Sequence, residues 1–184
     1  MQANENNSKV TVATCSLAGC FGCHMSFLDM DERILDLIDK VEFARSPIND
    51  IKVAAPCDIG LIEGGLCNEE NVHTLNEFRE HCGILVAVGA CAINGGVPAL
   101  RNEVELRDCL ETAYINSVGI VDPQVPTDRE LPLLLDRVRP VLDAVRIDYV
   151  LPGCPPPAEA FLEILTALIE GRKPQLGYQY RQFD

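Results

Sequence analysis

ILVAVGAC (residues 84–91) begins with five apolar residues in a row, and this run is bounded by glycine on both sides. A short, uninterrupted apolar run is typical of a strand buried on both faces, as in a parallel sheet covered by helices. Gly89 ends the run, and Cys91 follows two residues later. We therefore predict a central strand at residues 84–88 that delivers Cys91 to the carboxyl edge of a sheet.

Other apolar runs alternate with amphipathic stretches along the chain, which is the pattern of an α/β fold. Further strands are predicted at residues 9–14, 41–44, 58–63 and 147–151. Helices are predicted at residues 26–40, 68–82, 103–114, 130–139 and 157–170. Ser26, in a Ser-x-x-Asp pattern with Asp29, and Asn68 are expected to cap the first two helices. The prediction is a flavodoxin-like, doubly wound parallel sheet with helices on both faces.

Four of the nine cysteines stand beside glycine or proline just after predicted strands. Cys20 and Cys23 lie in GCFGC after the first strand, Cys91 follows the fourth, and Cys154 lies in PGCPP after the fifth. Because the carboxyl ends of parallel strands share one edge of a sheet, these thiols can meet there. Four thiolates from three separate loops favour an iron-sulfur cluster. We call these residues the four-cysteine site.

Two other interpretations of the four-cysteine site stay open. A structural zinc ion also takes four thiolates, but its ligands usually come as two local pairs, whereas Cys91 and Cys154 each stand alone. The second interpretation is a flavodoxin-like binding module whose cysteines bind no metal. Iron with acid-labile sulfide supports a cluster, and zinc without sulfide supports the structural site.

The remaining five cysteines are expected to have no metal-binding role. Cys82 and Cys109 fall in predicted helices and are interpreted as small buried apolar residues. Cys57 and Cys67 are expected in loops. Cys15, close to Cys20 at a strand end, is the one candidate to replace an assigned ligand.

Composition and charge exclude several classes of function. Fifteen Lys and Arg against twenty-eight Asp and Glu give a net charge of −13, which repels nucleic acid. No apolar run is long enough to span a bilayer, and the first residues resemble no signal peptide. An odd number of cysteines cannot all pair within one chain. We expect a cytoplasmic protein with reduced thiols and no membrane span.

The sequence resembles the small subunits of nickel-iron hydrogenases, and is most similar to the cytosolic NAD-reducing (bidirectional) type. The resemblance rests on GCFGCHMS (residues 19–26), IEGG (62–65), GACAINGG (89–96) and LPGCP (151–155). The cluster-bearing subunit of respiratory NADH-quinone oxidoreductase is also similar, but it carries adjacent cysteines where Cys20 and Cys23 are spaced. This spacing favours the hydrogenase.

The resemblance implies that Cys20, Cys23, Cys91 and Cys154 bind one proximal 4Fe-4S cluster. The cluster is then expected to relay electrons between the nickel-iron centre of a hydrogenase large subunit and a diaphorase module with further iron-sulfur clusters. The complex would catalyse H2 + NAD+ to NADH + H+, with the nickel-iron centre, FMN and NAD on partner chains and no catalytic residue on this one. The alternative is a related hydrogenase or quinone-oxidoreductase complex with a different acceptor.

Further expectations concern the surroundings of this cluster and the domain organisation of the chain. Residues 14–19 do not resemble a phosphate-binding loop, so we expect no FMN on this chain. Glu63 is expected either to form structural hydrogen bonds or to move protons, and His24 either to donate to a cluster sulfur or to contact the large subunit. We predict one iron-sulfur-binding domain over residues 1–184, with polar or irregular tails at 1–8 and 172–184.

Overall fold

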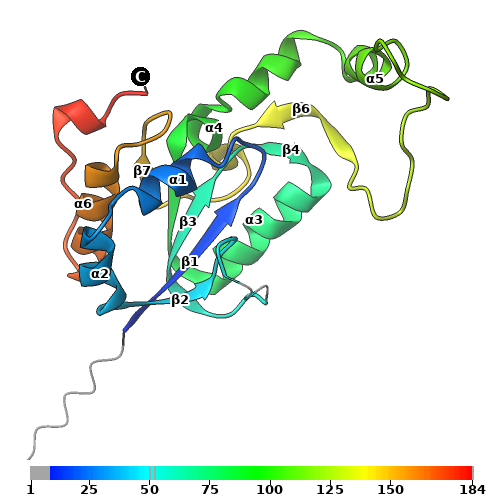
Figure 1. Cartoon of the computed structure of the whole chain (residues 1–184). Helices are drawn as coiled ribbons and strands as arrows, with labels where there is room; N and C mark the ends of the chain where they lie inside the picture. Colours follow the sequence, from blue (N-terminus) through cyan, green and yellow to red (C-terminus); the bar gives the residue numbers. More distant parts are fainter. Residues whose placement is uncertain (1–8, 50, 52, 184) are drawn as a thin grey trace, which may run out of the picture.

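A five-stranded parallel sheet forms the centre of the computed structural model, which describes residues 9–49, 51 and 53–183 (Figure 1). The strand order is β2-β1-β3-β5-β7. Numbered along the chain within this sheet, the order is 2-1-3-4-5, which is the flavodoxin arrangement. The strands are β1 (Val10–Ser16), β2 (Val41–Arg45), β3 (Cys57–Glu63), β5 (Cys82–Val88) and β7 (Tyr149–Leu151). The predicted fold class is confirmed.

Helices follow most of these strands, and two short strands lie outside the main sheet. The helices are α1 (Gly22–Leu28), α2 (Arg33–Ile38), α3 (Glu69–His81), α4 (Gly89–Asn94), α5 (Leu106–Tyr114) and α6 (Ala158–Ile169). Three 3-10 turns are η1 (Val97–Glu103), η2 (Val141–Asp143) and η3 (Tyr178–Tyr180). Strands β4 (Leu66–Asn68) and β6 (Leu134–Arg139) form an antiparallel ribbon. None of the described helices is both long enough and apolar enough to cross a membrane.

Successive side chains of the central strands point to opposite faces of the sheet, so the apolar ones form two hydrophobic cores, one on each face. On β5, Val86 and Val88 belong to the core that contains Phe27 of α1 and Phe161 of α6. Leu85 and Ala87, which alternate with these two valines, belong to the other core, which contains residues of α3 and α4. Figure 1 shows α1, α2 and α6 on one side of the sheet and α3 on the other. Helices therefore cover both faces, as the apolar runs indicated.

The predicted helix at residues 130–139 is wrong, because residues 134–139 form strand β6 instead. Leu66 of β4 pairs with Arg139, and the other edge of β6 is held by the side chain of Asn102. That amide accepts from the backbone N–H of Val138 at 2.7 Å and donates to its carbonyl oxygen at 2.8 Å. Tertiary hydrogen bonds on both edges thus favour an extended backbone over the local helical pattern.

The predicted helix at residues 26–40 is two helices, α1 and α2, and Ser26 does not cap either of them. Helix α1 begins upstream at Gly22, and Asp31 adopts a left-handed φ of 51°, which interrupts the helical path before α2. Ser26 is buried and its hydroxyl donates to the carbonyl oxygen of Pro156 at 2.6 Å. The other cap is confirmed, since Asn68 Oδ1 accepts from the backbone N–H of Asn71 at 2.8 Å.

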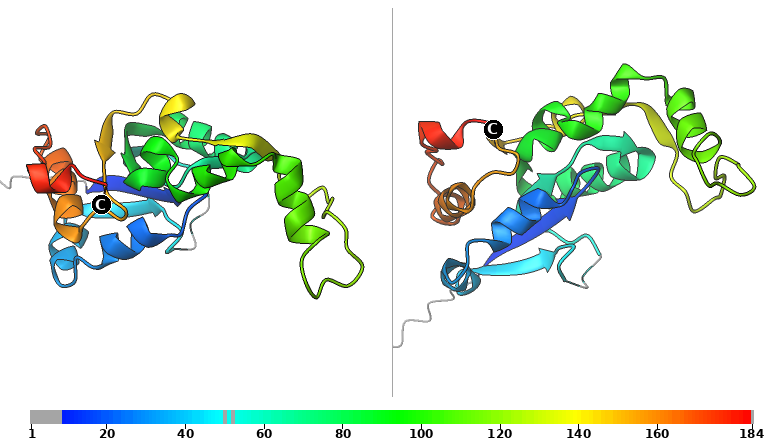
Figure 2. Two further views of the ribbon diagram at one scale, coloured as in Figure 1. Left: turned by 90° about the horizontal axis from the view of Figure 1, so that it is seen from above. Right: turned by 45° about the horizontal axis from the view of Figure 1, so that its top comes forward.

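Segments on either side of α5 project away from the sheet, as Figure 2 shows. Helix α5 starts at Leu106, three residues later than predicted, because residues 97–103 form the 3-10 turn η1. None of the α5 residues is buried. This projection therefore contributes little to either core.

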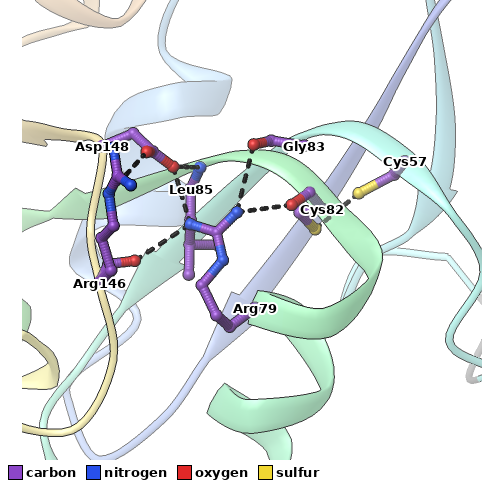
Figure 3. Close-up of polar contacts among 7 residues, drawn as sticks. All are labelled: Cys57, Arg79, Cys82, Gly83, Leu85, Arg146 and Asp148. Atoms are coloured by element: carbon purple, nitrogen blue, oxygen red, sulfur yellow. Dashed lines mark hydrogen bonds and ion pairs between the residues drawn. The ribbon is translucent and has the colours of Figure 1, made fainter.

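Arg79, near the end of α3, ties that helix to β5 and to the segment before β7 (Figure 3). Its guanidinium donates to the carbonyl oxygens of Cys82 and Arg146 at 2.7 and 3.0 Å. It also contacts Asp148 Oδ2 at 2.7 Å, and the same oxygen accepts from the backbone N–H of Leu85 at 2.9 Å. One carboxylate therefore links the Arg79 side chain to the backbone of the central strand.

Neutralising Asp148 is expected to weaken this link. Burial favours a higher pKa for Asp148, but the hydrogen bonds from Arg79 and from the Leu85 N–H outweigh it, so the pKa is lowered. The stabilisation is therefore present above about pH 4, the ordinary pKa, and is lost as the pH falls through the lower folded pKa. Asp148→Asn should lower the free energy of unfolding at pH 7 by about 1 to 2 kcal/mol. Urea unfolding at several pH values measures this, with the exposed Asp143→Asn as control; equal losses in both variants would contradict the assignment.

Candidate metal centre

The carboxyl edge of the sheet carries all four residues of the four-cysteine site. Cys20 lies in the loop after β1 and Cys23 in α1, while Cys91 lies in α4 after β5 and Cys154 follows β7. A hydrogen bond of 2.9 Å from the Ala90 N–H to the Gly153 carbonyl oxygen ties the last two segments together. The structure therefore gathers four cysteines that are far apart in the sequence.

Neighbouring thiols of the four-cysteine site contribute to the pKa shifts of Cys23 and Cys91. Burial is the largest cause that raises the pKa of Cys23, followed by Glu63 and by the neighbouring Cys91 and Cys20. Burial also raises the pKa of Cys91, and Cys154 and Cys20 add to this shift. Gathering thiolates here without a compensating cation is unfavourable. The site is thus suited to a positively charged metal group.

The kind of metal group depends on how closely the sulfurs converge. A zinc ion draws every sulfur to about 2.3 Å from one point, whereas an iron-sulfur cluster spreads its thiolates over separate irons. Within the ranges that the structure describes, no three His, Cys, Asp or Glu side chains form a group that could hold a single metal ion. A set of four cysteines is the usual ligand set of a 4Fe-4S cluster. The donors fit that group.

Two glycines, which have no side chain, leave room for the sulfur atoms of Cys23 and Cys91. Gly89 has a φ of +80°, and a Cβ atom there would overlap the Sγ atom of Cys23. Gly96 has a φ of +47°, and its Cβ atom would come 2.9 Å from the Sγ atom of Cys91. A side chain at either position is disfavoured by both the backbone conformation and the contact with a cysteine of the four-cysteine site. These two glycines therefore shape the cradle of the site.

Behind Cys23 lies a buried polar network centred on Glu63, which is only 3% exposed. Its carboxylate accepts from Ser16 Oγ at 2.6 Å and from the backbone N–H of His24 at 3.1 Å, and lies 3.0 Å from His24 Nδ1. Burial favours a raised pKa for Glu63, but the hydrogen bonds from His24 and Ser16 outweigh it and the pKa is lowered. Glu63 is therefore a buried carboxylate with its hydrogen-bond partners in place.

His24 is buried in the same network. Its Nε2 atom lies 2.9 Å from Thr14 Oγ1, which in turn donates to Ser46 Oγ at 2.8 Å. The imidazole ring also stacks on Phe21 with 4.6 Å between the centroids. Both ring nitrogens are thus occupied by groups of this chain. The sequence pattern contained no signal for Thr14 or Ser46, because their contact depends on the pairing of β1 with β2.

The other cysteines lie apart from the four-cysteine site. Cys15 is a core residue whose pKa burial raises to about 12, so it is a poor candidate to replace a ligand. Cys67 is in β4 rather than a loop, and Cys109 is in α5 as predicted but only half-buried.

Cys57 and Cys82 differ from the prediction. Cys57 is the buried first residue of β3, not a loop residue, and Cys82 is the first residue of β5, not part of a helix. Helix α3 ends at His81 because the backbone of Cys82 is already extended, with φ −95° and ψ 132°. Their Sγ atoms lie 2.6 Å apart.

Comparisons with known proteins agree over nearly the whole chain. A family model described as NADH ubiquinone oxidoreductase, 20 Kd subunit, matches residues 20–168. The NAD-reducing hydrogenase HoxS subunit delta of Cupriavidus necator is 46% identical, over 99% of this chain and 89% of that protein. A subunit of the F420-non-reducing hydrogenase vhu of Methanococcus voltae is 39% identical over 91% of this chain, which spans only 59% of that protein.

Solved structures give the same match. A chain in the crystal structure of an NAD+-reducing [NiFe]-hydrogenase in the H2-reduced state superposes with a TM-score of 0.94 at 51% identity. The match covers 96% of this chain and all of that one. A [NiFeSe]-hydrogenase chain from Dm. baculatum is 18% identical with a TM-score of 0.59, so it shares the fold alone.

Proposed function

This chain belongs to the family of the NADH ubiquinone oxidoreductase 20 kDa subunit, among the small subunits of NAD-reducing nickel-iron hydrogenases, and from this premise we propose that it transfers electrons through one 4Fe-4S cluster. The observation that carries the proposal is the gathering of Cys20, Cys23, Cys91 and Cys154 at one edge of the sheet. When bound, such a cluster accepts and returns one electron at a time.

The side chains of this subunit would hold and tune that cluster. The four thiols lose their protons to become ligands, and for Cys23 and Cys91 the raised pKa values make this unfavourable until the metal group supplies positive charge. Gly89 leaves room for the Cys23 sulfur, and Glu63 fixes the His24 ring through Nδ1. Cluster potentials depend on hydrogen bonds and burial around the sulfurs. We assign Glu63 and His24 to positioning Cys23, not to proton transfer.

Exposed apolar side chains around the four-cysteine site support a protein partner on this face. Met25, two residues after Cys23 in α1, is 53% exposed, and Val97 and Leu100 of η1, in the segment after Cys91, are also exposed. Cys20 and Cys154 themselves are exposed. Apolar groups of this kind typically mark interaction surfaces. The proposed partner on this face is the hydrogenase large subunit with the nickel-iron centre.

A diaphorase module is the second proposed partner. It would carry the FMN, the NAD site and further iron-sulfur clusters, and it would exchange electrons with the cluster of this chain in the reaction H2 + NAD+ to NADH + H+. We propose the cytoplasm as the compartment, because cysteines of cytosolic proteins are more often metal ligands than disulfides.

Metal and acceptor analysis of the purified complex tests the function. We expect about four irons and four acid-labile sulfides attributable to this chain, and hydrogen-dependent reduction of NAD+. Zinc without sulfide would instead support the structural zinc site. Hydrogen oxidation with another acceptor, but not with NAD+ or NADP+, would replace the diaphorase by a different electron carrier and leave the cluster assignment intact.

A further inference from the structure

Cys57 and Cys82 form a close thiol pair at the amino edge of the sheet, away from the four-cysteine site. They are the first residues of β3 and β5, and they face each other as register partners in this parallel strand pair. Their Sγ atoms are 2.6 Å apart (Figure 3). We propose that Cys57 and Cys82 are a reversible dithiol–disulfide site that hydrogen peroxide oxidises.

The backbone already has the spacing that a disulfide needs. Neighbouring strands lie about 4.8 Å apart, which is inside the range of about 4.4 to 6.8 Å that separates the Cα atoms of bridged cysteines. Both side chains belong to the same core, so they point to the same face of the sheet. Forming the bond therefore requires the two sulfurs to approach by roughly 0.5 Å more, toward about 2.05 Å, with no shift in strand register.

The surroundings of the pair distinguish the two sulfurs. The hydrogen bond from the Cys82 thiol lowers the pKa of Cys57, whereas that same hydrogen bond and burial raise the pKa of Cys82. The positive charges of Arg79 and Arg45 act on Cys82 in the opposite direction. The thiolate is the reactive form of cysteine, and the thiol of the pair whose pKa is lowered ionises first. Cys57 is therefore the attacking sulfur and Cys82 the resolving one.

The oxidation balances with peroxide as the only co-reactant. The Cys57 thiolate attacks one peroxide oxygen and the O–O bond breaks; the departing hydroxide takes up the proton that Cys57 released and leaves as water. Cys57 is then a sulfenic acid. The Cys82 sulfur attacks the Cys57 sulfur, the S–S bond forms, the S–O bond breaks, and the oxygen leaves as a second water with the Cys82 proton. The two thiols lose two electrons, and the peroxide gains them.

Access to the pair selects a small oxidant. Cys57 and Cys82 are only 6% and 5% exposed. A cavity of about 10 Å³, lined among others by Arg45, Ala54 and Cys82, reaches the Cys82 side of the pair, and this volume holds about one water molecule. Hydrogen peroxide is scarcely larger than water, whereas glutathione disulfide is far too large. The oxidant class is therefore a small hydroperoxide.

Peptide-resolved mass spectrometry of the purified complex tests the proposal. After treatment with hydrogen peroxide and alkylation of the free thiols, we expect a cross-linked peptide joining Cys57 to Cys82, which a thiol reductant converts back. In Cys82→Ser, the sulfenic acid should persist on Cys57 and react with dimedone. In Cys57→Ser, Cys82 should not be labelled. The Cys109→Ser variant is the matched control and should keep the cross-link.

Two outcomes would overturn the proposal. One is that both cysteines stay fully alkylatable in the wild-type complex under peroxide, a result that needs no variant. The other is that glutathione disulfide forms the cross-link as readily as peroxide does. Because the readout follows the peptides of Cys57 and Cys82, thiols released from a damaged metal centre do not affect it, so the proposed function and this site fail independently.

Discussion

Cys154→Ala is expected to remove most of the iron and sulfide from this chain and to lower hydrogen-dependent NAD+ reduction by about 100-fold or more. Mutation of a residue that only hydrogen-bonds to a metal ligand already lowers metal affinity or activity by about 10- to 100-fold. Removing a ligand itself should therefore have a larger effect. Cys154 is the best position for the test because it is exposed outside both cores. Removing its thiol should leave the sheet folded.

Iron, sulfide and activity measured on the same preparation check this result. Cys109→Ala is the matched control, since Cys109 lies on α5 away from the site, and we expect it to keep full iron content. Full iron, sulfide and activity in Cys154→Ala would remove that cysteine from the ligand set. Circular dichroism close to that of the wild type would show that the loss is local.

Glu63→Ala is expected to lower the free energy of unfolding by about 3 to 5 kcal/mol. The substitution removes the carboxylate that accepts from Ser16 and from two donors of His24. Buried donors without an acceptor carry the full cost of their desolvation. Glu63→Gln keeps the shape and one acceptor oxygen, so its loss should be smaller.

Urea unfolding of the full chain at pH 7 measures these differences. Glu159→Ala is the control, because Glu159 pairs with Arg33 at the surface and its side chain is 52% exposed. Exposed ion pairs contribute little to stability, so this variant should unfold close to the wild type. If Glu63→Ala cost no more than Glu159→Ala, the buried network would have no structural role.

The sequence was sufficient to predict the central sheet, because its strands are short apolar runs whose alternating faces meet two cores. On β5, Leu85 and Val86 illustrate this, since each lies in a different core. The same runs predicted where the four cysteines would gather, because a parallel sheet brings all its carboxyl ends to one edge. The identity of the bound group stays a prediction.

Errors arose where distant contacts override local preference. Residues 134–139 have a helical pattern, but β4 and the Asn102 amide hold them as a strand. Ser26 resembles a helix cap, yet its hydroxyl bonds to Pro156, 130 positions away. Cys57 and Cys82 each begin a strand slightly before its predicted start, and only the register of β3 with β5 brings them together. No local pattern contains such information.

The placement of β7 at one border of the sheet has a consequence for biogenesis. Its neighbour is β5, and its carboxyl end presents Cys154. A nascent chain leaves the ribosome amino end first, so Cys20, Cys23 and Cys91 emerge well before that last thiol. Assembly of a group that uses all four thiols, as proposed above, would therefore follow the docking of β7 against β5.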